Sequence, residues 1–364
     1  MTTRNPYRIV LRIALAAFAL AAASGCTRND EATPATQALT IRIASPDLSA
    51  GPTPSAGGGV AEAMRARQAL EKEFAADGIT VKWNFFKGAG PTINEGFANG
   101  QVDFAYLGDL AAIIGRANGL DTRFIAFTDH AVNEYLATPP DSTITRFTDL
   151  RGKRVAVFRG TADQLAFART LAEHGLSERD VRVINLDWSA ARAALIAGQI
   201  DAAWGHNSFL ALRDKGLVKV PLSTKDGRRS GTLQAGVVVS GAFASAHPEL
   251  VQRVVNVLAQ SAAWAADDAN REAFITLLSD NNAIPAAVYA AEYGDGNLQA
   301  RFSALADAPS IARLQASIDA ALEAGLIRKG FDAASWIDVG YARNALASSS
   351  AQPPTHDHDG SPVH

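Results

Sequence analysis

Short apolar runs alternate with stretches of helical periodicity from residue 39 onward. Residues 38–47 alternate between apolar and polar positions, which predicts a strand, and apolar residues three or four positions apart predict a helix over residues 60–76. The same succession leads to further strands over residues 101–108 and 122–128. Strands that alternate with helices in this way predict a mostly parallel sheet flanked by helices, and therefore an α/β fold.

One phrase occurs twice in the chain. Residues 98–109 read ANGQVDFAYLGD and residues 196–207 read IAGQIDAAWGHN, and each phrase places a helix end before an apolar strand that ends in glycine. A solenoid would repeat at a shorter period and in more copies, so the two phrases indicate two lobes of similar design. We expect a first lobe over residues 39–132 and 229–347, a second lobe over 133–228, and hinge crossovers near Asn133 and Arg228.

The first 25 residues have the order of an export signal, with three arginines, an apolar run over residues 13–23 and then small residues. The apolar run is shorter than the about 20 residues that span a bilayer. Cys26, the only cysteine of the chain, follows Ala23, Ser24 and Gly25. This order predicts removal of residues 1–25 and lipid modification of Cys26; the alternative is cleavage near Ala23 and a soluble periplasmic product.

Two segments lack any periodicity. Residues 26–38 are polar and contain Pro and Thr, which favours a flexible spacer. Residues 348–364 are rich in Ser, Pro and His and poor in apolar residues, which favours a disordered tail. We expect no metal site in this tail, because its histidines have no rigid neighbours to orient them.

The composition is that of a globular protein, with 48% apolar and 20% charged residues among 364. A net charge of −3 and the absence of a basic run beside aromatic residues exclude nucleic acid as an expected partner. No His pair has metal spacing, and no nucleophile or phosphate-loop motif follows a strand. We therefore expect a binding protein that is not an enzyme and that uses no cofactor or metal.

Four stretches carry a resemblance to a known family: FFKGAGPTINEGFANGQVDFAYLGDLAAIIGRANG, FTDLRGKRVAVFRGTADQLAFARTLAEHGL, AARAALIAGQIDAAWG and FASAHPEL. Over about residues 39–341 the chain resembles the periplasmic solute-binding proteins of ABC importers for sulfonates, taurine and nitrate. The resemblance implies the two-lobed type II periplasmic-binding-protein fold and a permease in the inner membrane as partner. The chain departs from the family where Leu110 and Ala111 follow Asp109 in place of a frequent proline, and in its long loop over residues 49–59.

Ligands of open parallel sheets bind beyond the carboxyl ends of the strands, where loops lead into helices. The stretches KGAGPT, YLGD and RGTA meet this description, and backbone N–H groups at helix N-termini suit an anion. The candidate ligand-binding residues are Thr92, Gly108, Asp109, Arg159, Gly160, Thr161, Ala162, Trp204 and His206.

Four of these candidates also have a structural interpretation. Asp109 is suited to cap a helix, and its carboxylate would repel an anion unless it holds an amine or orients a donor. Arg159 neutralises an anion or lies solvated at a strand end. Trp204 covers an organic group or packs in the core, and His206 contacts the ligand or serves as a structural donor.

The expected function is capture of a small organic anion, an alkanesulfonate or a related sulfur compound, by a monomeric periplasmic lipoprotein that delivers it to an ABC permease. Contact with the membrane is expected only through the lipid on Cys26. One alternative is an enzyme on the same fold, similar to the thiamin-pyrimidine synthases, which are cytoplasmic and lack an export signal. The other is a tethered protein that senses the same ligand without transport.

Replacement of Cys26 by Ser tests the anchor. The variant loses the lipid attachment site, so we expect it to move from the membrane fraction to the soluble fraction after cell fractionation. Wild-type protein that is already fully soluble would contradict the lipid anchor.

Overall fold

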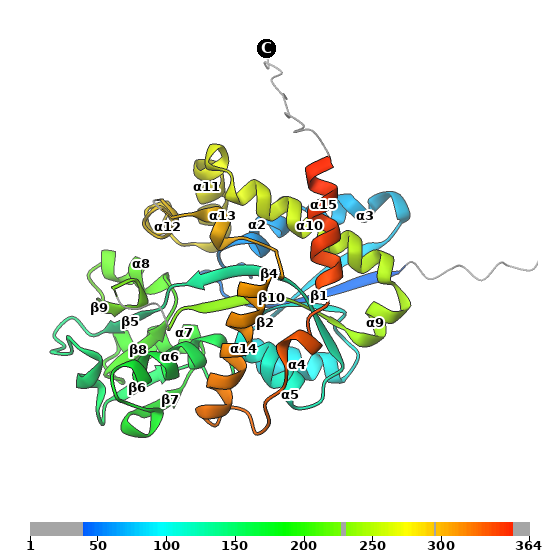
Figure 1. The fold of residues 1–364 in the computed structure, drawn as a ribbon. Helices are drawn as coiled ribbons and strands as arrows, with labels where there is room; N and C mark the ends of the chain where they lie inside the picture. The colour runs from blue at the N-terminus through cyan, green and yellow to red at the C-terminus, as the bar shows by residue number, and fades with distance from the viewer. Residues whose placement is uncertain (1–38, 227–230, 295, 352–364) are drawn as a thin grey trace, which may run out of the picture. The chain divides into compact units, whose positions relative to one another are not determined.

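The computed structural model describes residues 39–226, 231–294 and 296–351, and their strands form two five-stranded sheets (Figure 1). The expected export signal, Cys26 and the spacer lie outside the described residues. The same holds for Arg228 and for residues 352–364 of the expected tail. Within the described ranges, no helix combines the length and the apolar character needed to cross a membrane.

The first sheet has the strand order β2-β1-β3-β10-β4. β1 pairs in parallel with β2 and β3, whereas β10 is antiparallel to both β3 and β4, so four of the five strands share one direction. The strands are β1 (Thr40–Pro46), β2 (Thr80–Phe86), β3 (Phe104–Gly108), β4 (Thr122–Val132) and β10 (Leu233–Ser240).

The second sheet repeats this arrangement, with the order β7-β6-β8-β5-β9. β6 pairs in parallel with β7 and β8, and β5 is antiparallel to β8 and β9. The sequence analysis does not predict β5 and β9, which are only four and five residues long. The strands are β5 (Tyr135–Thr138), β6 (Arg154–Val157), β7 (Arg182–Asn185), β8 (Ala202–Gly205) and β9 (Lys219–Ser223).

The predicted α/β fold with two mostly parallel sheets is therefore confirmed. The chain passes from the first sheet to the second between β4 and β5 and returns between β9 and β10. In Figure 1, β4 and β10 appear as long neighbouring arrows that lead toward the green second sheet.

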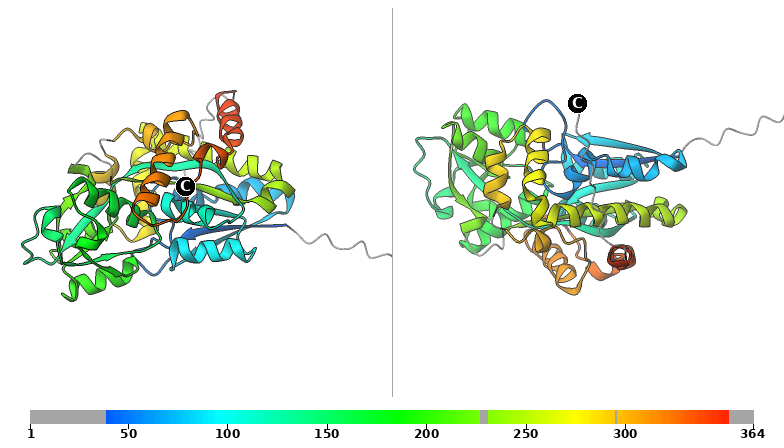
Figure 2. Two further views of the ribbon diagram at one scale, coloured as in Figure 1. Left: turned by 60° about the horizontal axis from the view of Figure 1, so that its bottom comes forward. Right: turned by 90° about the horizontal axis from the view of Figure 1, so that it is seen from above.

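Helices cover both faces of the first sheet, as the two turned views show (Figure 2). Successive residues of β3 point to opposite faces: Phe104 and Tyr106 pack among one set of helices, and Ala105 and Leu107 among the other. The first set includes α2 (Val60–Ala66), α3 (Ala69–Phe74), α9 (Gly241–Ala246), α10 (Pro248–Ala266), α11 (Arg271–Asn282), α12 (Ala286–Tyr293), α13 (Leu298–Arg301) and α15 (Val339–Ala351). The second set is α4 (Ala89–Ala98), α5 (Asp109–Ala117) and α14 (Ala308–Glu323).

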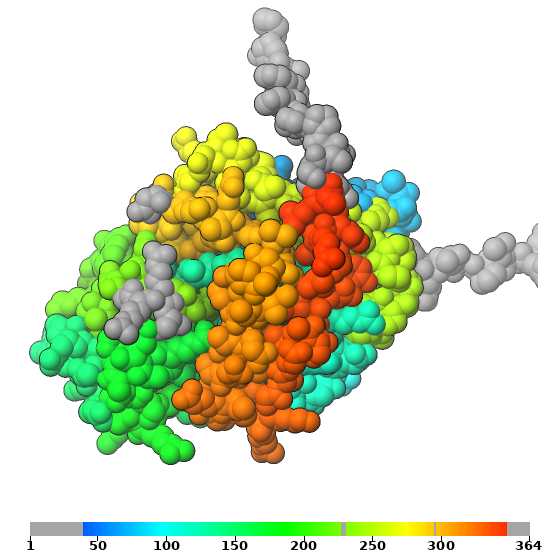
Figure 3. Space-filling view, viewed as in Figure 1, coloured from blue at the N-terminus to red at the C-terminus, as the bar shows by residue number. Residues whose placement is uncertain are grey.

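Three further helices flank the second sheet: α6 (Ala162–Glu173), α7 (Trp188–Ile196) and α8 (Ser208–Asp214). Val155 and Val157 of β6 face the core under α6, and Ala156 between them faces the core under α7 and α8. Helix α14 contacts both α5 and α6, and its orange surface adjoins the green surface of the second sheet in Figure 3. The C-terminal segment therefore contacts helices that flank both sheets.

Two predicted boundaries need correction. The helix expected over residues 60–76 is interrupted at Gln68, whose φ of 53° is left-handed and cannot continue a right-handed helix. At the other end, α15 continues to Ala351, so residues 348–351 are helical although the sequence analysis assigns them to the tail.

The repeated Gly-Gln-Val/Ile-Asp phrase makes the same interaction in both sheets. Asp103, one residue before β3, accepts hydrogen bonds from Arg42 of β1: from its backbone N–H at 2.8 Å, from Nε at 2.9 Å and from Nη2 at 2.5 Å. Asp201, one residue before β8, accepts the same three bonds from Arg154 of β6, at 2.7, 3.3 and 2.9 Å. Each aspartate thus fixes the start of a central strand against its parallel neighbour.

Neutralising the two aspartates should cost different amounts, because the Asp103 side chain is 6% exposed and the Asp201 side chain 33% exposed. We expect Asp103→Asn to lower the free energy of unfolding by about 2–3 kcal/mol and Asp201→Asn by about 1 kcal/mol. Urea denaturation measures both losses, with the exposed Asp141→Asn as control, for which a change within about 0.5 kcal/mol is expected.

The contribution of Asp201 should also depend on pH. Hydrogen bonding to Arg154 lowers the pKa of Asp201, so its stabilisation is present above the unfolded pKa and lost as the pH falls through the folded pKa. The difference between wild type and Asp201→Asn should therefore shrink below about pH 4. Two results would contradict these expectations. One is an equal loss of unfolding free energy in Asp103→Asn and Asp201→Asn, and the other is a difference between wild type and Asp201→Asn that does not change with pH.

Candidate ligand-binding site

A cavity of about 170 Å³ lies beyond the carboxyl ends of strands from both sheets. From the first sheet, Ser45 and Pro46 at the end of β1 and Gly108 at the end of β3 line it. From the second sheet, His206 after β8 and Thr161 before α6 do so. This is the place where open α/β sheets bind ligands.

Four of the nine candidate ligand-binding residues line this cavity: Gly108, Thr161, Ala162 and His206. Thr161 precedes α6, but its hydroxyl donates to the carbonyl of Phe158 at 2.7 Å and does not cap the helix. Ala162 begins α6 and Gly108 precedes α5, so the two helix N-termini meet at the cavity from opposite sheets.

Three other candidates are displaced from the cavity. Thr92 lies in the first turn of α4, whereas Ala89 and Gly90 of the same turn line the cavity. Arg159 is exposed, and its backbone N–H donates to Oδ1 of Asn185 at 3.0 Å. Gly160, in the loop between β6 and α6, lies against Gly90 and Pro91 of α4.

Asp109 faces α14. Its buried carboxylate accepts a hydrogen bond from the Leu110 N–H at 2.8 Å and another from the Ser317 hydroxyl at 2.8 Å. Burial raises the pKa of Asp109, and the positive charge of Arg169 opposes this shift. The helix-cap interpretation described the residue only in part, because Asp109 is the first residue of α5 and also bonds a distant helix.

Trp204 packs in the core of the second sheet and is not among the residues that line the cavity, which agrees with the second of its two interpretations. Its ring meets that of Phe147 edge to face and that of Phe167 at a tilt, and its indole N–H donates to the carbonyl of Asp163 at 3.1 Å. The tryptophan that lines the cavity is Trp188, whose indole N–H donates to the carboxylate of Asp163 at 2.6 Å. Two indoles thus hold the first turn of α6 in place.

The glycines of the candidate stretches allow the two halves to approach each other closely. A Cβ on Gly108 would lie 2.5 Å from the Cβ of Ala162, although Gly108 has φ −65° and ψ 154°, a conformation open to any residue. A Cβ on Gly90 would lie 3.2 Å from the carbonyl oxygen of Gly160, and one on Gly160 would lie 2.9 Å from Pro91. We call these five residues the seam.

The cavity also contains acidic residues that the sequence analysis did not identify. Four carboxylates line it, against one guanidinium, that of Arg301. The Arg301 guanidinium is engaged already, because its Nη1 donates to Glu292 at 2.9 Å and it lies 4.8 Å from the Tyr293 ring centre. The four carboxylates belong to Asp129, Glu134, Asp163 and Glu292.

Burial determines the protonation of these groups. It raises the pKa of Asp129 and of Asp163 to about 6, and it raises the pKa of Glu134 well above the ordinary range, with further repulsion from Asp163 and Glu292. Burial, with the nearby charge of Arg192, lowers the pKa of His206 to about 3. His206 is therefore neutral at physiological pH and supplies no positive charge to an anion.

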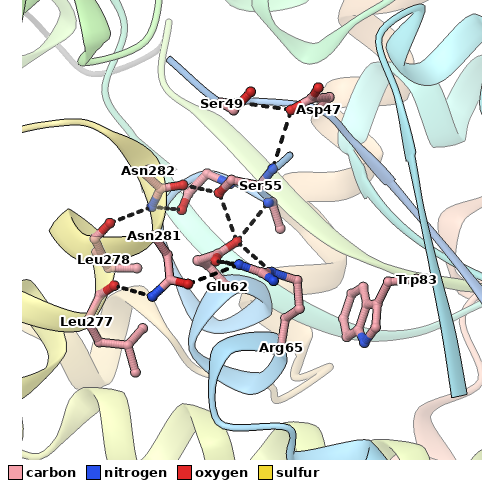
Figure 4. A network of polar contacts seen from close by, with 12 residues as sticks. Asp47, Ser49, Ser55, Glu62, Arg65, Trp83, Leu277, Leu278, Asn281 and Asn282 are labelled. Carbon is pink, nitrogen blue, oxygen red and sulfur yellow. Dashed lines mark hydrogen bonds and ion pairs between the residues drawn. The ribbon is translucent and has the colours of Figure 1, made fainter. Parts of the chain in front are cut away.

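The loop over residues 47–59 closes one side of the cavity and is held by a buried polar network (Figure 4). The Glu62 carboxylate accepts from the Ser55 hydroxyl and from the Ala56 N–H, both at 2.8 Å, and it pairs with Arg65. Asn282 of α11 donates to the carbonyl of Gly57 at 2.6 Å. This network fixes the loop whose glycines reach the cavity.

No group of three or more His, Cys, Asp and Glu residues that could hold a metal ion occurs within residues 39–226, 231–294 and 296–351.

Comparisons of sequence find relatives that are named as binding proteins. An aliphatic sulfonates-binding protein of Bacillus subtilis (strain 168) is 27% identical over 198 residues, which cover 54% of this chain and 58% of the relative. An aliphatic sulfonates-binding protein of Escherichia coli (strain K12) is 28% identical over 62% of this chain and 69% of its own length. The taurine-binding periplasmic protein of the same strain is 28% identical over 53% of this chain and 59% of its own length. The chain thus matches little more than half the length of two of these three relatives.

Solved structures extend the likeness over most of the chain. A periplasmic sulfonate-binding protein SsuA from Methylobacillus flagellatus KT is 29% identical with a TM-score of 0.72, and the match covers 88% of this chain and 99% of that one. The alkanesulfonate-binding SsuA from Xanthomonas axonopodis pv. citri bound to MOPS is 25% identical with a TM-score of 0.68, over 82% and 97% of the two chains. The desulfurization enzyme DszB, 18% identical over 85% of this chain and 99% of its own, shares the fold with a TM-score of 0.60.

The profile of the NMT1/THI5-like family matches residues 69–272, which is more than half of the 364 residues. Together with the two sheets of equal topology and the cavity between them, this match shows that the chain belongs to the NMT1/THI5-like family, in which its relatives include sulfonate- and taurine-binding proteins.

Proposed function

We propose that this protein is the substrate-binding component of an ABC importer and that it captures a small organic sulfonate in the cavity between its two sheets. The observation that carries the proposal is the meeting of helix N-termini from both sheets at one cavity, those of α4, α5 and α6. The sulfonate-binding relatives and structural neighbours support the same ligand class.

The proposed position of the sulfonate follows from these helix ends. The first N–H groups of a helix lack partners within the helix, and the helix dipole places partial positive charge beside them. Gly90 in the first turn of α4 and Gly108 before α5 both line the cavity, so the backbone at these two helix ends is within reach of a ligand. Backbone donors therefore bind the sulfonate oxygens in place of Arg159, which is exposed.

We propose binding without catalysis. The residues that line the cavity include no cysteine, and the one cysteine of the chain is assigned to lipid attachment. The desulfurization enzyme DszB is 18% identical to this chain, a likeness that shows the fold alone. The enzyme and the tethered sensor remain the alternatives to an importer component.

The proposed setting is the periplasm, with a lipid on Cys26 as the membrane anchor and a monomer as the working form. The partner that receives the ligand is an ABC permease in the inner membrane. The description of the SsuA from Methylobacillus flagellatus KT as part of a sulfonate ABC transporter supports this assignment.

A ligand panel tests the ligand class by thermal unfolding. A ligand that binds only the folded state at about 100 times its dissociation constant stabilises it by about 2.7 kcal/mol. For a domain of this size that corresponds to a rise of the melting midpoint by about 5 °C or more. We expect the rise with at least one member of a set of alkanesulfonates, aminoalkanesulfonates, MOPS and aryl sulfonates, and none with uncharged sugars.

Two outcomes would contradict the proposal. Stabilisation by uncharged compounds alone would exclude the sulfonate as ligand. Release of sulfite from any member of the panel during incubation with the protein, above a heat-denatured control, would show an enzyme and exclude a pure binding role.

Gly108→Val tests whether the two halves close over the ligand. A side chain on Gly108 cannot coexist with Ala162 at 2.5 Å, so it penalises the closed arrangement by about 1–3 kcal/mol. We expect ligand affinity to fall about 5- to 150-fold while the free protein keeps its circular dichroism spectrum.

Small-angle scattering completes this test. Wild-type protein should contract on addition of the sulfonate that stabilises it best, and Gly108→Val should not. Gly296→Ala is the control, because a Cβ on Gly296 meets no atom within 4 Å. Equal affinity and equal contraction in all three proteins would refute closure across the seam.

A further inference from the structure

The carboxylate of Glu134 is buried without a partner. The residue is 0% exposed, and neither of its side-chain oxygens has a hydrogen-bond partner within the described part of the chain. Glu134 lines the cavity, so its carboxylate is available to a ligand there. A buried carboxylate without a partner lowers the free energy of unfolding. A ligand that pairs with it would offset this loss.

The position of Glu134 is fixed by its backbone at the crossover between β4 and β5. Its N–H donates to the Thr224 hydroxyl at 3.0 Å, and its carbonyl accepts from the Thr224 N–H at 3.0 Å. Thr224 follows β9 in the second connection between the sheets. The carboxylate therefore stands where the two connections between the sheets are hydrogen-bonded to each other.

The charges around Glu134 favour a cation over an anion. The carboxylates of Asp163 and Glu292 act on it electrostatically, and the side-chain partner of Asp163 is a neutral indole, that of Trp188. The single guanidinium of the cavity is already paired with Glu292. A purely anionic ligand would meet net negative charge on this side of the cavity, whereas a positively charged nitrogen group would be attracted.

We propose that the ligand carries a positively charged nitrogen group that binds to the carboxylate of Glu134 beside Asp163, so that the substrate is an amino-substituted sulfonate and not a simple alkanesulfonate. This inference rests on the proposed function for the sulfonate end of the ligand. An organic cation fits better than a metal ion, since no cluster that could hold a metal occurs in the described part of the chain.

The alternative is a protonated Glu134 that donates a hydrogen bond to a sulfonate oxygen. The two assignments predict opposite changes of ligand affinity with pH. Binding of a cation requires the ionised carboxylate, so it releases a proton from the acid, and affinity rises with pH. Donation by the protonated acid makes affinity fall as pH rises. Both pH profiles include the other charged and titratable groups that act on Glu134 or line the cavity. These are Tyr106, Asp129, Tyr135, Asp163, His206, Tyr289, Glu292, Tyr293 and Arg301.

Matched probe pairs measure the contribution of the nitrogen group. Calorimetric titration of the full chain should compare 2-aminoethanesulfonate with ethanesulfonate and 2-hydroxyethanesulfonate, and 3-aminopropanesulfonate with propanesulfonate. We expect each amino compound to bind at least about 30-fold more tightly than its partners without nitrogen. Repetition in buffers of different ionisation enthalpy should reveal proton release with the amino compounds.

Glu134→Gln tests the assigned residue, because it keeps the shape and removes the charge. We expect the amino compounds to lose at least about 30-fold in affinity and to release no proton on binding to this variant. The melting midpoint of the free variant should equal or exceed that of wild type, because an unpaired buried acid is gone. Glu95→Gln, an exposed position on α4, is the control and should leave all affinities unchanged.

The outcomes separate the inference from the proposed function. If ethanesulfonate and propanesulfonate bind as tightly as the amino compounds, or if Glu134→Gln changes no affinity, the cationic group is refuted and the sulfonate function stands. If ethylamine or propylamine binds and no sulfonate does, the proposed function fails and the role of Glu134 survives. Absence of binding by every probe contradicts both.

Discussion

Thr224 joins the two segments that connect the sheets. Its N–H and its hydroxyl bond the backbone of Glu134, and the hydroxyl also donates to the Asn133 side chain at 3.3 Å. The Asn133 amide in turn donates to Glu292 at 2.8 Å, so the C-terminal helices are fixed to the same point. The direction in which the second sheet faces the first, the position of the seam and the floor of the cavity all depend on this cluster of hydrogen bonds.

A cavity rich in acidic residues can bind an anionic group if the ligand has two different ends, one bound at the helix N-termini and the other at the carboxylates. Helix N-termini act over a short range and supply donors without a countercharge, so an anionic group bound there needs no arginine. The carboxylate of Glu134 lies at the crossover between β4 and β5, and burial raises its pKa and the pKa values of Asp129 and Asp163, which disfavours their ionised forms in the absence of a positive group. The cavity can therefore select against ligands with a single charge.

The sequence alone predicted what depends on local pattern and repetition. The duplicated phrase indicated two sheets of one design, and it encodes the same Arg–Asp contact twice. The sequence left Trp204 open between ligand contact and core packing, because a strand buried on both faces gives no alternation from which the direction of a side chain can be deduced. Arg301 and Glu134 have no local motif, and they meet at the cavity only because the chain crosses between the sheets and returns. Such residues require the tertiary structure for their identification.

The polar network beneath the loop over residues 47–59 bears on how the protein acquires its structure. Ser55 and Gly57 bond Asn282, a residue 227 and 225 positions further along the chain. Loop closure over such a separation is slow compared with the pairing of neighbouring strands. We expect the cavity to be completed late in folding, after the second sheet has formed, so that an incompletely synthesised or truncated chain would possess most of the sheets and still bind nothing.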